Sequence, residues 1–323
     1  MWLRVLILLA GICFFPMKSY AVNCSVSTVP SVAFGTVSPF ATSDATTSVI
    51  INYSCTKVLG DLLGAYTLCF NLGAPGGNTI ATRKMTTTGG SLNYQIYYKN
   101  PSNANVVWGN QTAGNGMFPM INLNLLDLTP VTGSITLTAI VPLGQTTAPP
   151  GNYTDTYTAA TAYVTINSAL AIPPNACSST VLQSFPFVVT ASVNKFCNIN
   201  TTRNVSLGSV AHTQTNVMNN NYFTMTCTNS TAYTVGLSPS NNNTAGSGVM
   251  KSVSNAATNT NLVPYQLNST AGVGGTPWGN LTANTVAGIG TGSAVNRTVY
   301  VVVPSANYRP DDYADTVTIN VTY

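Results

Sequence analysis

The sequence predicts an all-β protein made of two β-sandwich domains in tandem. The chain has 323 residues, and one pattern occurs twice, before and after a segment that begins at Cys177. In both copies, short stretches rich in Val, Ile, Thr and Tyr alternate with Gly, Pro, Asn and Ser, as is typical of strands separated by turns. No stretch combines helical periodicity with capping residues, so helices are not expected.

The two copies match at several places along the chain. Each opens with a cysteine and a short predicted strand, and a second cysteine follows about thirty residues after the first. Each closes on a Tyr-x-Asp-Thr motif before a last strand. The matched positions are Cys24 and Cys197, 32–35 and 205–208, Cys55 and Cys227, Tyr66 and Tyr233, Tyr94 and Tyr265, Trp108 and Trp278, and Tyr153 and Tyr313. This self-similarity indicates two domains of one fold.

The first 21 residues have the pattern of a secretory signal. They carry Arg4, an apolar run too short for a membrane span, and small residues at Ser19 and Ala21, so we expect cleavage after Ala21. A membrane anchor is the alternative. The mature chain is then expected to hold an N-terminal domain at 22–176, a linker or donor-like strand at 177–196 and a C-terminal domain at 197–323.

The charge composition excludes one class of partner. Without the signal the chain has nine basic and seven acidic residues, and it contains no Glu and a single histidine, His212. Nucleic-acid binding requires a basic stripe, and the sequence has none. A surface with so little charge protects weakly against self-association, which suits a protein that functions in an assembly.

The cysteines predict three disulfides. Cys13 leaves with the signal, and an even number in an exported chain argues for full pairing. Six cysteines allow fifteen pairings, which the sequence alone does not settle. The repeat suggests that Cys24–Cys55 and Cys197–Cys227 are equivalent bridges, which leaves Cys69 for Cys177. That third bridge would pin the middle segment to the first copy.

The first copy contains three insertions relative to the second, and two of them are apolar. They lie between Cys55 and Tyr66, between Trp108 and Pro142, and between Pro142 and Tyr153. Because exposed apolar loops usually mark a binding surface, we expect surface-binding residues here. The candidates are Val58, Leu59, Leu62, Leu63, Met117, Phe118, Pro119, Met120, Ile121 and Leu143.

The position of these insertions is open in part. The first and third follow the second and penultimate strands, so they can lie at one end of an up-and-down sandwich. We expect 117–120 to form an exposed tip. Residues 121–128 are either part of that surface or an extra strand, because Ile121, Leu123 and Leu125 alternate with polar residues.

The middle segment alternates as a strand with one apolar face. Phe187, Val189, Ala191 and Val193 share one parity, with more polar residues between them. It could complete the first copy or lead into the second, and the pattern does not choose.

With these residues in view, the chain resembles a pair of spore coat protein U domains, the pilin domains of archaic (Csu-type) chaperone–usher pili. The resemblance rests on the cysteine spacing and on the repeated Tyr-x-Asp-Thr closing motif. It implies immunoglobulin-like sandwiches that lack one strand, which a neighbouring pilin donates by β-strand addition. It also implies a periplasmic chaperone and an outer-membrane usher as partners, with a closing strand used in assembly at Val317, Ile319, Val321 and Tyr323.

The resemblance further implies a place in the fibre. Only Val22 and Asn23 precede Cys24 after cleavage, so the first copy is expected to donate no strand, while the second accepts one. Such a subunit would end the fibre at the cell surface as a tip adhesin. The apolar loops would then attach to abiotic or host surfaces and support biofilm formation.

Three other functions were weighed. An enzyme is disfavoured because His212 has no carboxylate near it in sequence, and Asp155 and Asp315 recur as expected turn or strand-edge residues. No cofactor is expected: Asp311 and Asp312 fall short of a calcium shell, and the cysteines lack zinc spacing. A glycan-binding fimbrial adhesin using Trp108 and a structural spore coat or envelope protein remain alternatives.

Overall fold

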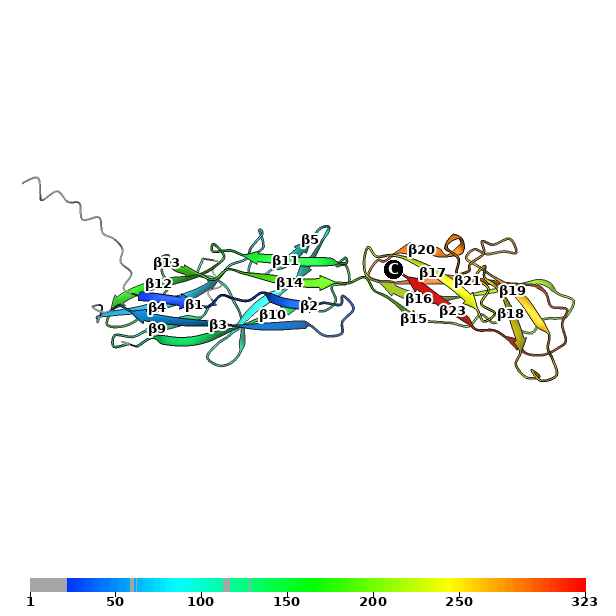
Figure 1. Ribbon diagram of the computed structural model, residues 1–323, viewed down its shortest axis with the longest axis horizontal. Helices are drawn as coiled ribbons and strands as arrows, with labels where there is room; N and C mark the ends of the chain where they lie inside the picture. Colours follow the sequence, from blue (N-terminus) through cyan, green and yellow to red (C-terminus); the bar gives the residue numbers. More distant parts are fainter. Residues whose placement is uncertain (1–21, 59–60, 62, 113–116, 128) are drawn as a thin grey trace, which may run out of the picture.

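The computed structural model describes residues 22–58, 61, 63–112, 117–127 and 129–323. Within these residues the chain is all-β apart from one 3-10 turn, as expected. Two immunoglobulin-like β-sandwiches lie end to end along the long axis of the molecule (Figure 1). No described helix is long and apolar enough to cross a membrane.

The N-terminal domain contains fourteen strands in three sheets. The strands are β1 (Val22–Val26), β2 (Val32–Thr36), β3 (Ala45–Lys57), β4 (Gly64–Leu72), β5 (Lys84–Thr87), β6 (Gly90–Asn93), β7 (Gln95–Lys99), β8 (Asn105–Val107), β9 (Met120–Leu123), β10 (Val131–Val141), β11 (Gly151–Tyr157), β12 (Ala162–Leu170), β13 (Val181–Ser184) and β14 (Phe187–Val193). Their sheet orders are β1-β3-β10-β7-β8, β2-β14-β11-β5-β6 and β13-β12-β4-β9.

The C-terminal domain is smaller and has two sheets. Its elements are β15 (Cys197–Thr201), β16 (Thr215–Cys227), β17 (Ala232–Pro239), β18 (Ser247–Ser252), β19 (Leu262–Asn268), η1 (Thr282–Asn284), β20 (Val286–Ile289), β21 (Ala294–Ser305), β22 (Tyr313–Ala314) and β23 (Val317–Thr322). The sheet orders are β15-β16-β21-β19-β18-β22 and β20-β17-β23. The two domains have the same orientation along the long axis of the molecule: in each, the first strand (β1 or β15) lies toward the left of the domain in Figure 1.

Strand β14 closes the N-terminal domain from within the chain. It pairs antiparallel with β11 from Gly151↔Val193 to Tyr157↔Phe187, and parallel with β2 at Val189↔Val32. Phe187, Val189, Ala191 and Val193 are buried, as the alternation predicts. The strand β13 before it pairs with β12, so the segment predicted to join the copies completes the first one.

The C-terminal domain has no counterpart of β13 and β14 among its strands. Residues 205–208, predicted as a strand by analogy with β2, form none, because β2 pairs only with β14. Strand β22 has two residues, whereas its counterpart β11 has seven. In the C-terminal core, partly buried apolar residues outnumber the fully buried ones. In the N-terminal core, the fully buried residues are the large majority. The C-terminal sandwich is therefore open along one side.

One equivalence drawn from the sequence is wrong by two residues. In the first domain Trp108 Nε1 donates to Phe70 O, and in the second Trp278 Nε1 donates to Val235 O. Leu68, and not Tyr66, therefore corresponds to Tyr233. The insertion before β4 is two residues longer than the match of Tyr66 with Tyr233 indicates. The Tyr66–Tyr233 match rested on identical residues alone, whereas the two tryptophan hydrogen bonds fix which residues of the two strands correspond.

The three disulfides are those that the repeat suggests. Cys24–Cys55 and Cys197–Cys227 join directly paired residues on neighbouring strands. Cys69–Cys177 spans 108 residues and joins β4 to the chain just before β13. It therefore fixes the start of the segment that closes the N-terminal core.

We predict that removing Cys69–Cys177 costs more stability than removing Cys197–Cys227. A longer closed loop restricts the unfolded chain more, which gives about 5 kcal/mol for the first bridge and about 3.5 kcal/mol for the second. Urea unfolding of Cys69→Ala/Cys177→Ala and Cys197→Ala/Cys227→Ala would measure this. Equal losses would mean that the first bridge does not constrain a long loop in the unfolded state.

Candidate functional site

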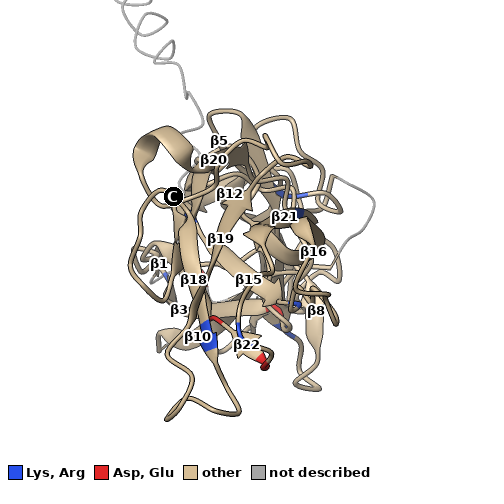
Figure 2. Cartoon of the chain, turned by 90° about the vertical axis from the view of Figure 1, so that its right-hand side faces the viewer, with Lys and Arg blue, Asp and Glu red and all other residues tan. Residues whose placement is uncertain are grey.

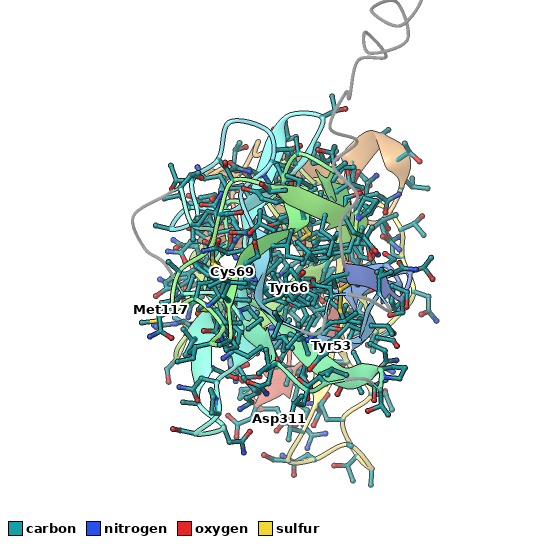
Figure 3. All side chains as sticks on the ribbon, turned by 90° about the vertical axis from the view of Figure 1, so that its left-hand side faces the viewer. Tyr53, Tyr66, Cys69, Met117 and Asp311 are labelled. Atoms are coloured by element: carbon teal, nitrogen blue, oxygen red, sulfur yellow. A yellow bond between two sulfur atoms is a disulfide. The ribbon has the colours of Figure 1, made fainter. Side chains whose placement is uncertain are left out.

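Three loops meet at the end of the N-terminal domain that lies farthest from the C-terminal domain. Their described residues are 58, 61 and 63 between β3 and β4, 124–127 and 129–130 between β9 and β10, and 171–180 between β12 and β13. Lys57 Nζ donates to Gly64 O and Leu125 O, which joins the first two loops. Ala171 N donates to Leu63 O, which joins the first and third. We call this end the distal surface (left in Figure 1; facing the viewer in Figure 3).

The distal surface exposes aliphatic side chains from all three loops. Leu63 is 69% exposed and Leu126 is 76% exposed. The remaining members are Val58 at 50%, Leu170 at 79% and Ile172 at 75%. Isolated exposed aliphatic side chains are common, but these five, on adjoining loops and at the end of β12, form a group that water solvates poorly.

Leu170 and Ile172 were not among the residues predicted from the sequence. The insertions were found by comparison with the second copy, and the printed sequence offers no residues of that copy for comparison with this loop. The predicted Cys69–Cys177 bridge could have indicated that these two residues lie at this end of the domain. It places the residues before Cys177 beside β4, whose first residue, Gly64, pairs with Leu170.

The predicted candidates divide among three places. Val58 and Leu63 lie on the distal surface, while Leu59 and Leu62 are outside the described residues. Met117 and Met120 are exposed on the side of the domain, where β9 runs along β4. In Figure 3 the label of Met117 stands at the margin of the outline, whereas those of Tyr66 and Cys69 stand near its middle.

The expected exposed tip at 117–120 is only partly correct. Pro119 is buried, and its carbonyl accepts a hydrogen bond from Phe70 N. Phe118 and Ile121 are partly buried against the core. Residues 120–123 form the extra strand β9, with Leu123 buried, so the strand alternative holds for this part.

The third insertion lies at the opposite end of the domain, so it does not join the first. Leu143 is exposed there, and its N–H donates to Asp44. The same loop contacts the C-terminal domain: Asn229 Nδ2 donates to Thr147 O at 2.8 Å, and a β-carbon at Gly292 would collide with Thr146 O. This insertion therefore belongs to the domain junction.

The open side of the C-terminal domain forms a second candidate surface. Val205 and Leu207 are partly exposed, whereas Val32, the counterpart of Val205, is fully buried under β14. The predicted assembly-strand residues Val317, Ile319 and Val321 lie on β23, are partly buried, and pack against the core. Tyr323 is 48% exposed. An apolar strip beside β23, which lies at the edge of its sheet, is suited to an added strand.

The repeated Asp of the closing motif has a structural partner in both domains. Tyr94 OH donates to Asp155 at 2.6 Å and contacts Tyr157 OH at 3.0 Å, while Tyr265 OH donates to Asp315 at 2.5 Å. Asp155 is buried within β11 and accepts a hydrogen bond, so a hydrogen-bonding role in a strand holds for it and the turn alternative does not, whereas Asp315 lies between β22 and β23. A feature present in both copies is architectural.

Burial dominates the electrostatics of this cluster. It raises the pKa of Asp155, against opposing effects of the Tyr94 hydrogen bond and the positive charge of Arg83. It also raises the pKa of Tyr157 to about 12, and that of Tyr94 further still. Both phenols therefore stay neutral as hydrogen-bond donors.

The other polar candidates are occupied or isolated. His212 is exposed in a turn. Asp311 accepts hydrogen bonds from Ser252, Asn255 and Asn259, which lower the pKa of its carboxyl. In the described part of the chain no three His, Cys, Asp or Glu side chains gather as metal ligands. The positions of charged residues along the chain are few and scattered in the view of Figure 2.

Both tryptophans of the described chain are structural. Trp108 is 0% exposed and Trp278 is 1% exposed, and each donates its indole N–H to a backbone carbonyl. Neither can stack on a sugar ring without the core opening. The main residue-level argument for a glycan site is thereby removed.

A sequence-family comparison accounts for both domains. The model of the Spore Coat Protein U domain matches residues 16–160 and 183–320. The chain belongs to this family. No curated protein sequence matches it.

Solved structures share the architecture. The CsuC–CsuE chaperone–tip subunit pre-assembly complex of the archaic Csu pili of Acinetobacter baumannii matches with a TM-score of 0.50 and 16% identity, over 93% of this chain and 100% of that chain. The CupB6 tip adhesin of Pseudomonas aeruginosa matches with a TM-score of 0.42 and 12% identity, over 94% of each chain. The spore coat protein U chain thus shares the two-domain fold of the tip subunit in the Csu complex.

The buried carboxyl predicts a pH effect on stability. Because the folded state holds the Asp155 proton more tightly than the unfolded state, the free energy of unfolding should fall as pH rises from about 4 through the raised pKa. Asp155→Asn keeps an acceptor for Tyr94 and should flatten that fall. Urea unfolding of the wild type and the variant between about pH 4 and pH 7 tests it; equal slopes would contradict the assignment to Asp155.

Proposed function

We propose that this spore coat protein U protein is the tip adhesin of a chaperone–usher pilus, exported to the cell surface, where it supports attachment and biofilm formation. The observation that carries the proposal is the distal surface. Its exposed aliphatic side chains lie at one end of the molecule, and the incomplete domain lies at the other. An adhesin requires that polarity, because one end meets a surface while the other joins the fibre.

The chemistry of the distal surface favours an apolar target, whether abiotic or on a host. Its largest exposed side chains are Leu and Ile, which offer neither charge nor stacking rings to a glycan. Burying roughly 100 Å2 of apolar area contributes about 2.5 kcal/mol. Many tips on one cell would add avidity.

The open side of the C-terminal domain suits a strand from the next pilin subunit. Strand β14 serves as a template: it fills the same place in the N-terminal domain by pairing with β11 and β2. A periplasmic chaperone would cover the strip before assembly at the outer-membrane usher. The similar Acinetobacter structure is itself a complex of a chaperone and a tip subunit.

We predict that the distal leucines carry attachment. In Leu63→Ser/Leu126→Ser/Leu170→Ser, pili should assemble normally while attachment to polystyrene falls more than tenfold, because the apolar contact is lost. Cells counted per pilus, by microscopy after washing, give the measurement.

Two variants serve as controls for position. Leu143→Ser removes an exposed leucine at the domain junction and should attach as the wild type does. Met117→Ser/Met120→Ser removes exposed apolar side chains from the side of the domain. It distinguishes a contribution of that side to attachment from a contribution of the distal surface. If the triple distal variant attaches normally, the proposed adhesive role of this surface is wrong.

We also predict that the chain's own closing segment can fill the open C-terminal domain. A copy of residues 167–194, with Cys177→Ser, would be appended after Tyr323, the structural counterpart of Ile166. Amide hydrogen exchange at 205–208 and 313–322 should slow, and the chain should no longer join pili, because the place of the donor strand is taken.

The matched control carries Phe187→Asn, Val189→Asn and Val193→Asn in the appended copy, which removes the apolar face and keeps the backbone. It should restore fast exchange. Exchange unchanged by the original graft would show that this side of the domain does not accept a strand.

A further inference from the structure

Lys57 is a buried lysine directly beneath the distal surface. It is the last residue of β3 and is 8% exposed. Lysine is almost never buried to this extent unless its ammonium is satisfied, because desolvation of the charge is costly. Its burial therefore calls for partners.

Three backbone carbonyls supply them. Lys57 Nζ lies 2.8 Å from Gly64 O, 3.1 Å from Asn124 O and 2.7 Å from Leu125 O. An ammonium has three N–H donors, and three acceptors match that number. Gly64 follows the β3–β4 loop, whereas Asn124 and Leu125 open the β9–β10 loop, so one side chain ties together two segments about sixty residues apart.

The neighbouring bonds extend this connection to the whole distal surface. Asp61 accepts hydrogen bonds from Gly64 N and from Tyr66 OH, which braces the first loop. Leu63 O accepts from Ala171 N, which attaches the third loop. Every loop that exposes an apolar side chain at this end is thus held, directly or through one further bond, at Lys57.

We propose that Lys57 is the positioning residue of the distal surface: its ammonium ties the loops together at their bases, so that Leu63, Leu126 and Leu170 stay exposed together. This rests on the adhesive role proposed above. Apolar side chains on unanchored loops would pack against one another and withdraw from solvent. Anchored loops keep them exposed and lose less conformational entropy on contact with a target.

The test compares Lys57→Met with Lys57→Arg in the full-length subunit, assembled into pili. Methionine keeps an unbranched stem and removes every donor, whereas arginine keeps the charge and donors. Attachment to polystyrene per pilus should fall at least tenfold in Lys57→Met and recover in part in Lys57→Arg. Lys99→Met is the matched control, because Lys99 is exposed on a side hairpin and donates to Asn103 O.

Hydrogen exchange separates positioning from general destabilisation. In Lys57→Met it should accelerate only at 61–66 and 122–127. Acceleration throughout the N-terminal domain, or attachment equal to the wild type while the triple leucine variant fails, would overturn the role of Lys57. If Lys57→Met and the triple leucine variant both attached normally, the adhesive role of the distal surface would be wrong instead.

Discussion

The pairing of β14 on both of its edges is the constraint on which the rest of the structure depends. In the N-terminal domain this strand lies between β2 and β11 and buries four alternating side chains. In the C-terminal domain no described strand takes its place, residues 205–208 form no strand, and β22 is a two-residue strand that pairs with β18. One element therefore separates a finished sandwich from an open one with a similar sequence.

The closure of the first domain also organises its distal surface. The chain that leads to β13 and β14 must first turn at the far end, and this turn exposes Leu170 and Ile172. Cys177 fixes it to Cys69 on β4, and Lys57 joins β4 to the neighbouring loop. Intramolecular completion thus supplies both a stable core and one of the three loops of the proposed adhesive site.

Much of this arrangement could be predicted from the chain alone, since period-two alternation at Phe187–Val193 and duplicated cysteine spacing are direct records of strand faces and neighbours. The predictions that failed concerned segments whose structure depends on contacts with other parts of the chain. Residues 205–208 resemble β2 but have no strand to pair with. Leu143 was expected beside the first insertion because the two loops follow the second and penultimate strands, but its loop lies at the opposite end, at the domain junction. Leu170 was missed because the printed sequence offers no residues of the second copy for comparison with this loop. Contacts such as Lys57 with three carbonyls leave no sequence pattern.

The continuity of β14 into β15 has a mechanical consequence. Only residues 194–196 separate the two strands, so in the proposed adhesive role tension between the distal surface and the fibre would pass along β14 itself. The strand lies along the long axis of the molecule (Figure 1), and its ladders to β2 and β11 run beside it. Pulling in this direction shears all of those hydrogen bonds at once, whereas pulling across the sheet would break them one by one. The N-terminal domain is thus loaded in its most resistant direction.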